Sequence, residues 1–280
     1  MKRTVIFCAG LLALALPLAA DSASASSSLK AAYDSGFYPG VVRYADEILK
    51  QSPGTPAAAQ AAVYKGESLY RMGRLEEARA ALEAAPLAAG DSPELYAGRS
   101  YWLGRICSDT SDWQGALSAF LEAAKASKDR PEASGYYAYS LFYAGGVYYT
   151  LGDYEKAQPL YRYVISHGRD YALADYQQAA VKLLDLLVRR SLFTQAADLA
   201  AQLEEAPFSE DARYRLLLSR GDALSGLQDY KGAYRLYSQV LADCDDAALA
   251  VTALQKAYQV SSSHREAVGQ EPGALLAQAQ

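Results

Sequence analysis

The sequence has little cysteine and histidine, and it lacks a dense block of basic residues. Its 280 residues include three cysteines, two histidines, 27 lysines and arginines, and 32 aspartates and glutamates, for a formal net charge of -5. Binding to a polyphosphate depends on lysine and arginine side chains that displace counterions. The acidic balance therefore argues against nucleic acid as a partner, and the absence of any basic run argues against a polybasic membrane patch.

The few cysteines and histidines predict neither a disulfide nor a metal site. Cys8 lies in an N-terminal apolar stretch, whereas Cys107 and Cys244 are far apart in the sequence. A disulfide between these two would need Cα atoms within about 7 Å of each other. We expect two free thiols, with Cys107 buried as a small hydrophobic residue. Together with His167 and His264 they are too scattered for a zinc site, and we expect no cofactor.

The sequence motifs of common enzyme classes are absent too. No G-x-S-x-G motif, H-E-x-x-H motif, P-loop or glycine-rich dinucleotide fingerprint occurs. His167, in the segment ISHGRD, is typical of a residue that caps the end of a helix. We interpret the adjacent acidic pairs as exposed helix starts and loops: Glu76-Glu77, Glu204-Glu205 and Asp245-Asp246. We therefore expect no enzymatic activity.

Residues 1–25 have the layout of a secretory signal peptide. A basic pair, Lys2 and Arg3, precedes the apolar residues 4–20, and Ala23-Ser24-Ala25 matches the small-residue cleavage preference. We expect cleavage after Ala25 and export, to the periplasm or out of the cell. The alternative is a retained membrane anchor, although the apolar run is short for a spanning helix and Pro17 interrupts it. No other stretch is long and apolar enough to cross a bilayer.

The remaining residues, 26–280, have the composition of a helical globular protein. Hydrophobic residues make up 51% of the whole sequence and charged residues 21%. Alanine, leucine, glutamate, arginine and glutamine favour helix, and all are abundant. Proline and glycine collect at intervals instead of spreading evenly, which indicates repeated short connections between helices.

One pattern recurs in five segments: GRLEEARAAL (73–82), SDWQGALSAF (111–120), GDYEKAQPLY (152–161), SLFTQAADLA (191–200) and QDYKGAYRLY (228–237). Each has an aromatic residue or leucine three positions before a fixed alanine, and a bulky residue or alanine four positions after it. A glycine precedes the fixed alanine by twelve positions in four of the five, with Leu184 as the exception. The repeated small residues are Gly66, Ala78, Gly104, Ala116, Gly145, Ala157, Ala196, Gly221 and Ala233.

This pattern resembles the tetratricopeptide repeat (TPR), in which L-G-x-x-Y on a first helix precedes A-x-x-x-F on a second. Two antiparallel helices approach closely only where a side chain is small, so we expect the glycine to face the alanine. The turn between the helices falls on residues 73, 111, 152, 191 and 228, where glycine tolerates left-handed dihedrals. The resemblance implies an all-α fold, a right-handed superhelical stack of antiparallel helix pairs (an α-solenoid) of about six to seven units.

A weaker copy precedes these five segments and a partial copy follows them. Val41 takes the alanine position in the earlier copy, with Pro39 in the first turn of its second helix, and Ala267 takes it in the later one. Pro159 lies inside a predicted second helix and predicts a kink. The predicted units are 26–53, 59–90, 97–128, 138–168, 177–206, 214–243 and a partial or capping unit at 248–268.

The resemblance also implies that the first helices line the concave face of the superhelix. Rigid aromatic side chains with interspersed arginine suit a peptide-binding surface because they bury area at low entropic cost. Projected onto this sequence, the register puts on that face Tyr70, Arg71, Tyr101, Arg105, Tyr139, Phe142, Tyr149, Asp185 and Arg189, and also Asp222. Packing within the stack is the alternative for Tyr101, Tyr139 and Tyr149, and a solvated helix end is the alternative for Arg189.

These observations predict a non-catalytic protein-interaction module or scaffold of the bacterial cell envelope, which binds a peptide or protein segment in its concave groove. One alternative is a structural subunit without a peptide groove, in outer-membrane protein assembly or cell-wall coordination. A more remote alternative is a helical accessory region of a cell-wall-cleaving enzyme, although the sequence contains no second domain. The expected partner is a protein or peptide, with no nucleic acid and no membrane-spanning segment after signal cleavage.

Overall fold

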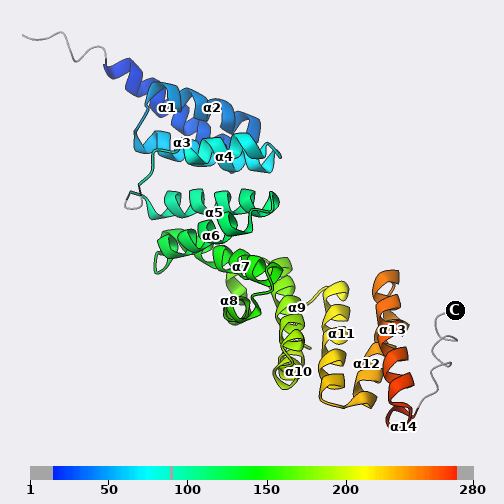
Figure 1. The fold of residues 1–280 in the computed structure, drawn as a ribbon. Helices are drawn as coiled ribbons and strands as arrows, with labels where there is room; N and C mark the ends of the chain where they lie inside the picture. Colours follow the sequence, from blue (N-terminus) through cyan, green and yellow to red (C-terminus); the bar gives the residue numbers. More distant parts are fainter. Residues whose placement is uncertain (1–14, 89–90, 270–280) are drawn as a thin grey trace, which may run out of the picture. The chain divides into compact units, whose positions relative to one another are not determined.

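The computed structural model describes residues 15–88 and 91–269, which form fourteen α-helices and two short 3-10 helices, with no strand in these ranges (Figure 1). The predicted all-α fold is thus confirmed. None of the described helices combines the length and the apolar composition that a membrane span requires. The helices are α1 (Ala15–Asp34), α2 (Tyr38–Gln51), α3 (Pro56–Arg71), α4 (Leu75–Glu83), α5 (Pro93–Asp109), α6 (Trp113–Ser127), η1 (Pro131–Ala133), α7 (Ser134–Thr150), α8 (Tyr154–Ser166), η2 (Gly168–Asp170), α9 (Leu173–Arg189), α10 (Phe193–Gln202), α11 (Glu210–Gly226), α12 (Tyr230–Asp243), α13 (Ala247–Ser263) and α14 (Arg265–Val268).

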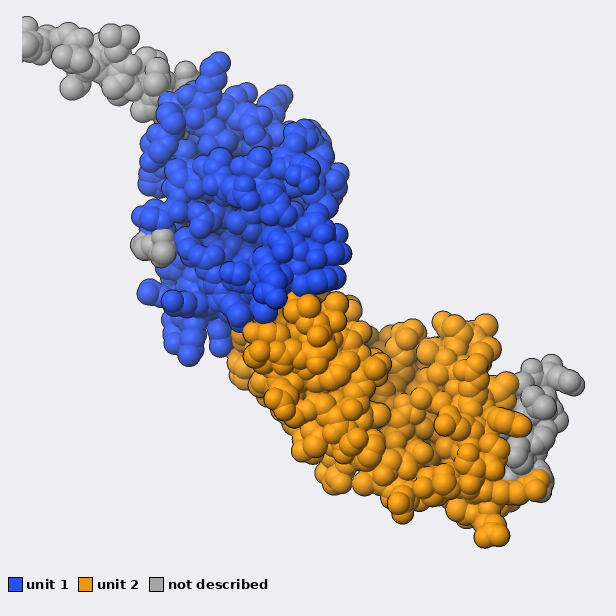
Figure 2. Space-filling view, in the orientation of Figure 1, with its two compact units in different colours: residues 1–140 blue, residues 141–280 orange. Residues whose placement is uncertain are grey.

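The chain divides into two compact units, residues 1–140 and 141–280, which we call unit 1 and unit 2 (Figure 2). Odd-numbered helices are the first helices of each pair and even-numbered helices the second. In unit 1 the first helices α1, α3 and α5 pack in sequence, and each also packs on its own second helix. In unit 2 the first helices α9, α11 and α13 do the same. Each unit therefore presents a row of first helices, which is the surface that the sequence pattern predicts for binding.

The first helix passes through the predicted cleavage position. Residues 1–14 of the predicted signal peptide lie outside the described residues, and α1 begins at Ala15. Ala25, Leu29 and Ala32 are buried against residues of α2, including Ile48. A chain that begins after Ala25 would keep Leu29 and Ala32, so most of this small core does not depend on the predicted signal segment.

The small residues of the repeat lie where the paired helices pack. The fixed alanines at 78, 116, 157, 196 and 233 are fully buried. A Cβ atom added to Gly221 would lie 2.4 Å from the Tyr237 ring, closer than real Cβ contacts allow. The side chains that fill the space beside the four glycines are Leu82 at Gly66, Phe120 at Gly104, Tyr161 at Gly145 and Tyr237 at Gly221. At Gly66, Gly104 and Gly221 the closest neighbour is thus the bulky residue four positions after the alanine, and at Gly145 this residue is as close as Leu160 Cβ, at 3.3 Å. The sequence pattern predicts the alanine itself in this place.

In two helix pairs the large and small residues of this contact are exchanged: the large residue is on the first helix and the small one is on the second. In the fifth pair Leu184 stands at the glycine position and Ala200 at the bulky position, and both are buried. In the first pair Leu29 stands at the glycine position and Ala45 at the bulky position, and both are buried. A core tolerates such an exchange because the summed side-chain volume is conserved. This explains why Leu184 is compatible with the repeat.

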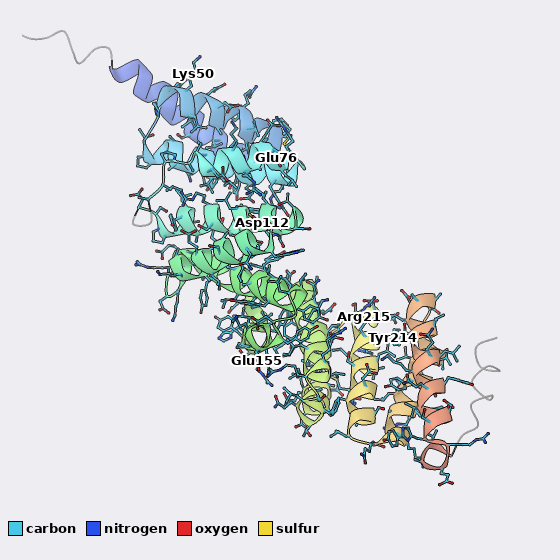
Figure 3. All side chains as sticks on the ribbon, viewed as in Figure 1. Lys50, Glu76, Asp112, Glu155, Tyr214 and Arg215 are labelled. Atoms are coloured by element: carbon cyan, nitrogen blue, oxygen red, sulfur yellow. The ribbon has the colours of Figure 1, made fainter. Side chains whose placement is uncertain are left out.

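The turns between paired helices have left-handed backbone at the predicted positions. Gly73 and Gly152 have φ angles of 76° and 75°, and Ser111, Ser191 and Gln228 have φ angles of 61°, 57° and 66°. A non-glycine residue adopts this conformation at a cost of about 1–2 kcal/mol. In three turns an aspartate then caps the second helix; Asp112, labelled in Figure 3, accepts a hydrogen bond from the Gly115 backbone N–H at 2.9 Å.

The last unit differs from the prediction in its register. Ala267 is exposed, whereas Val268 is buried against the core of the preceding helices. The predicted alanine position is therefore wrong by one residue. The reason is the length of α14, which has four residues and ends at Gly269 with φ 69°. So short a helix can bury one side chain, and the branched valine buries more apolar surface than the alanine beside it.

Other local predictions are also met in the described residues. Pro39 lies in the first turn of α2, as predicted. Pro159 lies inside α8, as predicted, and a kink at this residue stays a prediction. His167 is the C-cap residue of α8, and its ring stacks on Tyr163 with 3.9 Å between centroids. Cys107 and Cys244 are free thiols, and Cys107 is buried.

Adding a methyl group at a contact glycine should destabilise the fold. For Gly221→Ala we expect a loss of about 1–3 kcal/mol in the free energy of unfolding, because the buried Tyr237 ring blocks the new Cβ. The matched control is Gly146→Ala, also in a helix of unit 2, where the only neighbour within 4 Å of a Cβ is the Tyr161 hydroxyl at 3.9 Å. This control should gain up to about 1 kcal/mol in helix propensity. Urea unfolding, monitored by circular dichroism, measures the free energy of unfolding of both variants. Equal changes in the two variants would contradict the packing described.

Candidate functional site

Consecutive first helices are bridged by a tyrosine and a carboxylate. The Tyr33 hydroxyl on α1 donates to Glu67 on α3 at 2.7 Å, and the Tyr70 hydroxyl on α3 donates to Asp109 on α5 at 2.6 Å. In unit 2 the Tyr149 hydroxyl on α7 donates to Asp185 on α9. The two residues of each bridge are 34, 39 and 36 positions apart, about one repeat, because neighbouring first helices lie side by side.

In the first of these bridges the carboxylate is buried. Glu67 is 4% exposed and accepts hydrogen bonds from the Tyr33 hydroxyl and from Arg71 Nε, the latter at 2.9 Å. A buried charge is tolerated when it is paired in this way. Burial and the hydrogen bond to Glu67 raise the pKa of the Tyr33 phenol far above its usual value. The Tyr33 ring also stacks on Tyr64, with 3.9 Å between centroids.

Arg71 extends from this buried pair along a row of aromatic rings. Its guanidinium carbon lies 5.1 Å from the centroid of Trp102 and 5.8 Å from that of Tyr38. The Trp102 ring in turn lies 5.1 Å from the Tyr70 ring. Although Glu67 holds one side of the guanidinium, 44% of the Arg71 side chain remains exposed. The residue is therefore fixed and still accessible.

Arg105 lies on the next first helix, α5, at the repeat position that Glu67 has on α3. Its guanidinium donates to the Tyr70 hydroxyl at 2.9 Å and to the Tyr101 hydroxyl at 3.1 Å. The same guanidinium lies 5.3 Å from the Tyr70 ring centroid. Burial and the hydrogen bond to Asp109 raise the pKa of Tyr70 to about 12, although Arg105 opposes the shift. We call Tyr38, Tyr70, Arg71, Trp102 and Arg105 the aromatic array of unit 1. Trp102 is 6% exposed and forms its buried floor, whereas the other four side chains are half-buried or exposed.

Tyr101 lies beneath this array in the core. It is 7% exposed, and its ring contacts Trp102, Phe120 and Tyr136 at centroid distances of 5.1, 6.0 and 5.7 Å. Its hydroxyl accepts a hydrogen bond from Arg105 and its ring contacts Trp102, so Tyr101 supports the array from the core. Tyr139, on the part of α7 that belongs to unit 1, is half-buried.

The predicted residues of unit 2 form a second cluster. Arg189 Nε donates to Asp185 at 2.6 Å, on the same carboxylate that accepts from Tyr149. The Lys182 ammonium lies 4.3 Å from the Tyr149 ring centroid. Burial and the hydrogen bond to Asp185 raise the pKa of Tyr149 to about 12. Phe142 is 5% exposed and packs in the core against Tyr161, so it adds little surface.

A hollow lies beside this cluster, between the first helices α9 and α11. Its volume is about 370 Å³, and Gln178, Lys182 and Arg215 are among the residues that line it. Arg215 is labelled on α11 in Figure 3 and is paired with Asp211, with Nε to Oδ2 at 2.9 Å. Farther along, Asp222 accepts from Tyr237 and from Lys256 of α13, at 2.8 and 2.7 Å. Of the predicted residues of unit 2, Asp185 is thus paired with Arg189 within α9, and Asp222 is paired with Lys256 on the next first helix.

Several residues of these clusters are not among the sequence predictions: Tyr33, Tyr38, Glu67, Trp102, Asp109 and Lys182. One sequence signal points to some of them. An acidic residue follows a first-helix tyrosine by about one repeat length in the pairs Tyr33 and Glu67, Tyr70 and Asp109, and Tyr149 and Asp185. No comparable signal identifies Trp102 or Lys182.

In the part of the chain that the structure describes, no group of three or more histidine, cysteine, aspartate or glutamate residues is placed to hold a metal ion.

Comparison with known proteins supports a repeat of this type. The tetratricopeptide-repeat family model matches residues 29–93. Sequence comparison with curated proteins gives no match. The matched segment runs from the last part of α1 to the first residue of α5, so the later pairs are assigned from the fold.

Solved structures share this fold at low sequence identity. YrrB, a TPR protein with an unusual peptide-binding site, has a TM-score of 0.60 and 14% identity over 75% of this chain and 97% of its own. A tetratricopeptide-repeat protein from Parabacteroides merdae has a TM-score of 0.55 and 14% identity over 92% and 97%. The apo form of RapI has a TM-score of 0.64 and 11% identity over 92% and 74%. At these identities the likeness shows the fold alone.

The tyrosine–carboxylate bridge should contribute stability that alkaline pH removes. The usual phenol pKa is about 10, and that of Tyr149 is raised to about 12 in the folded chain. The contribution is therefore fully present below pH 10 and is lost as the pH rises through 12. We expect Tyr149→Phe to lower the free energy of unfolding by about 1 kcal/mol at pH 8 and by progressively less above pH 10.

Urea unfolding measured from pH 8 to pH 12 tests this expectation. Tyr258→Phe serves as the control because Tyr258 is 49% exposed on α13 in the same unit. A Tyr149→Phe deficit that stays constant across the pH range would show that the bridge does not act as described.

Proposed function

Because this chain has the fold of tetratricopeptide-repeat proteins, we propose that it is a non-catalytic module that binds a peptide or protein segment along its first helices. The observation that carries the proposal is the aromatic array of unit 1, in which Arg71 and Arg105 are held against aromatic rings and remain accessible. The peptide-binding site of YrrB, a protein of the same fold, adds support.

The array suits peptide recognition for two physical reasons. Aromatic and arginine side chains dominate the energetically important centres of protein interfaces. Each guanidinium is also fixed before any partner arrives, Arg71 by Glu67 and Arg105 by Tyr70 and Tyr101. Side chains that are ordered in advance lose less entropy on binding, which leaves more of the contact energy as affinity.

Two carboxylates beside the array, Glu67 and Asp109, offset its positive charges. Arg71 is paired with Glu67, and Arg105 lies next to the Tyr70 hydroxyl that donates to Asp109. A partner therefore meets the rings of Tyr38 and Tyr70 and two guanidinium groups whose charge nearby carboxylates offset. We expect stacking and hydrogen bonding to recognise it, with a weak dependence on salt.

Selection from a random heptapeptide display library on the purified chain tests the proposal. We expect the wild type to enrich a peptide motif and the Arg71→Gln/Arg105→Gln double variant to lose it by at least about ten-fold, the scale of one bidentate contact. The matched control is Arg74→Gln, because Arg74 is exposed in the same unit and its ion pair with Glu77 is at the start of α4. Circular dichroism checks that each variant is folded.

Enrichment that survives in the double variant, or that Arg74→Gln abolishes equally, would contradict the proposal. So would a chain that enriches no peptide and instead captures folded proteins in fixed ratio from envelope extracts. That result would favour a structural subunit without a peptide groove.

We also propose that the module is exported and works in the cell envelope, as the signal-like layout of residues 1–25 suggests. Cleavage after Ala25 would leave the first helix pair with Leu29 and Ala32 in its core. When the full-length chain is expressed in a bacterium with two membranes, we expect the periplasmic fraction to contain a protein whose first residue is Ser26. Mass spectrometry of the intact protein measures this. A membrane-bound chain that retains residues 1–25, or one confined to the cytoplasm, would contradict it.

A further inference from the structure

Unit 2 contains a second hollow, on the side of α11 away from the row of first helices. It has a volume of about 410 Å³ and is bordered by α10, α11, α12 and the segment 203–208. On α11 the residues at 213, 216, 217 and 220 line it, and their spacing of three, four and seven gives one helical face. Asp211 and Arg215, which line the hollow between α9 and α11, lie on the opposite face of the same helix. The two hollows are therefore separate.

The floor of this hollow is apolar. Leu203, Phe208, Leu216 and Leu236 line it, and each is at most 9% exposed. Ala200 and Ala206 add two small side chains between them. The volume is in the range of natural ligand sites, about 300–1,000 Å³. A ligand that enters the hollow would meet apolar side chains first and displace water from them.

Its rim carries three arginines, and two of them have no counter-ion. Arg220 forms an ion pair with Glu204 at 3.0 Å. Arg213 on α11 and Arg235 on α12 are exposed, and no ion pair or side-chain hydrogen bond joins either to any residue that the structure describes. Two guanidinium groups at the edge of an apolar hollow are complementary to acidic groups, which they can bind with two parallel hydrogen bonds.

We propose that this hollow binds a short peptide segment in which an apolar side chain is flanked by acidic residues. The apolar side chain occupies the floor, and the flanking carboxylates pair with Arg213 and Arg235. A peptide fits better than an alkyl chain because the rim is polar. The Glu204 and Glu205 carboxylates can accept hydrogen bonds from a peptide backbone, and the Gln239 amide can both accept and donate them. An alkyl chain would leave these groups facing hydrocarbon, at a cost in free energy.

Isothermal titration calorimetry with two blocked pentapeptides tests the assignment on the purified chain. The probes are GEFEG and its neutral counterpart GQFQG, both acetylated and amidated. We expect GEFEG to bind at least ten-fold more tightly than GQFQG, and the Arg213→Gln/Arg235→Gln variant to lose this preference. Arg162→Gln is the matched control, because Arg162 is exposed in the same unit and does not line the hollow. It should bind both peptides as the wild type does.

Three results would overturn the proposal. These are equal affinity for the two peptides, an unchanged preference in the Arg213→Gln/Arg235→Gln variant, and displacement of GEFEG by millimolar decanoate, which would assign the hollow to a fatty acid. The Arg71→Gln/Arg105→Gln variant separates this proposal from the binding surface on the first helices. GEFEG binding should be unaffected in that variant, and its loss there would assign the peptide to the aromatic array instead.

Discussion

The structure depends on one packing constraint: a bulky side chain of one helix packs against a glycine, which has no side chain, on the paired helix. At Gly66, Gly104 and Gly221 the space that a Cβ atom would need is occupied by the side chain of the paired helix, and a Cβ at Gly145 would be in tight contact. This contact sets how closely the two helices of a pair approach. Repeat proteins are stabilised by such contacts within repeats and between neighbours, because no single pair buries a sufficient core. The rows of first helices in each unit follow from the repetition of this one contact.

Once the pairs are fixed, the first helices of neighbouring pairs are close enough for their polar side chains to meet. The hydrogen bonds from Tyr33 to Glu67 and from Tyr70 to Asp109 join helices that are one repeat apart. The first bridge holds the buried Glu67, which in turn holds Arg71. In the second, Tyr70 also accepts a hydrogen bond from Arg105. The arginines then lie over aromatic rings, as Arg71 does over Trp102. Packing in the core thereby orders the accessible side chains that our proposal assigns to binding.

Much of this could be predicted from the sequence, but not all. The fixed alanines, the left-handed turn positions and the helix pairs follow from contacts within about 16 residues, which repeat in register. The exposure of first-helix residues is harder to predict, because one residue along a helix changes its direction by about 100°. Tyr70 and Tyr101 are both aromatic residues of a kind that suits a binding surface, yet Tyr101 is 7% exposed and Tyr70 is half-buried. The contacts of Trp102 with Tyr70 and Arg71 can be recognised only when neighbouring repeats are placed side by side. Val268 was missed because a helix of four residues does not follow the register.

Site-specific photo-crosslinking in intact cells tests most directly whether the first helices form the binding surface. A photoreactive phenylalanine analogue replaces Tyr70 on α3 in one variant, and in another it replaces Leu121, which is 40% exposed on the second helix α6 of the same unit. If the first helices form the binding surface, we expect a crosslinked partner from position 70 and none from position 121. Crosslinks of equal yield at both positions, or at position 121 alone, would contradict it.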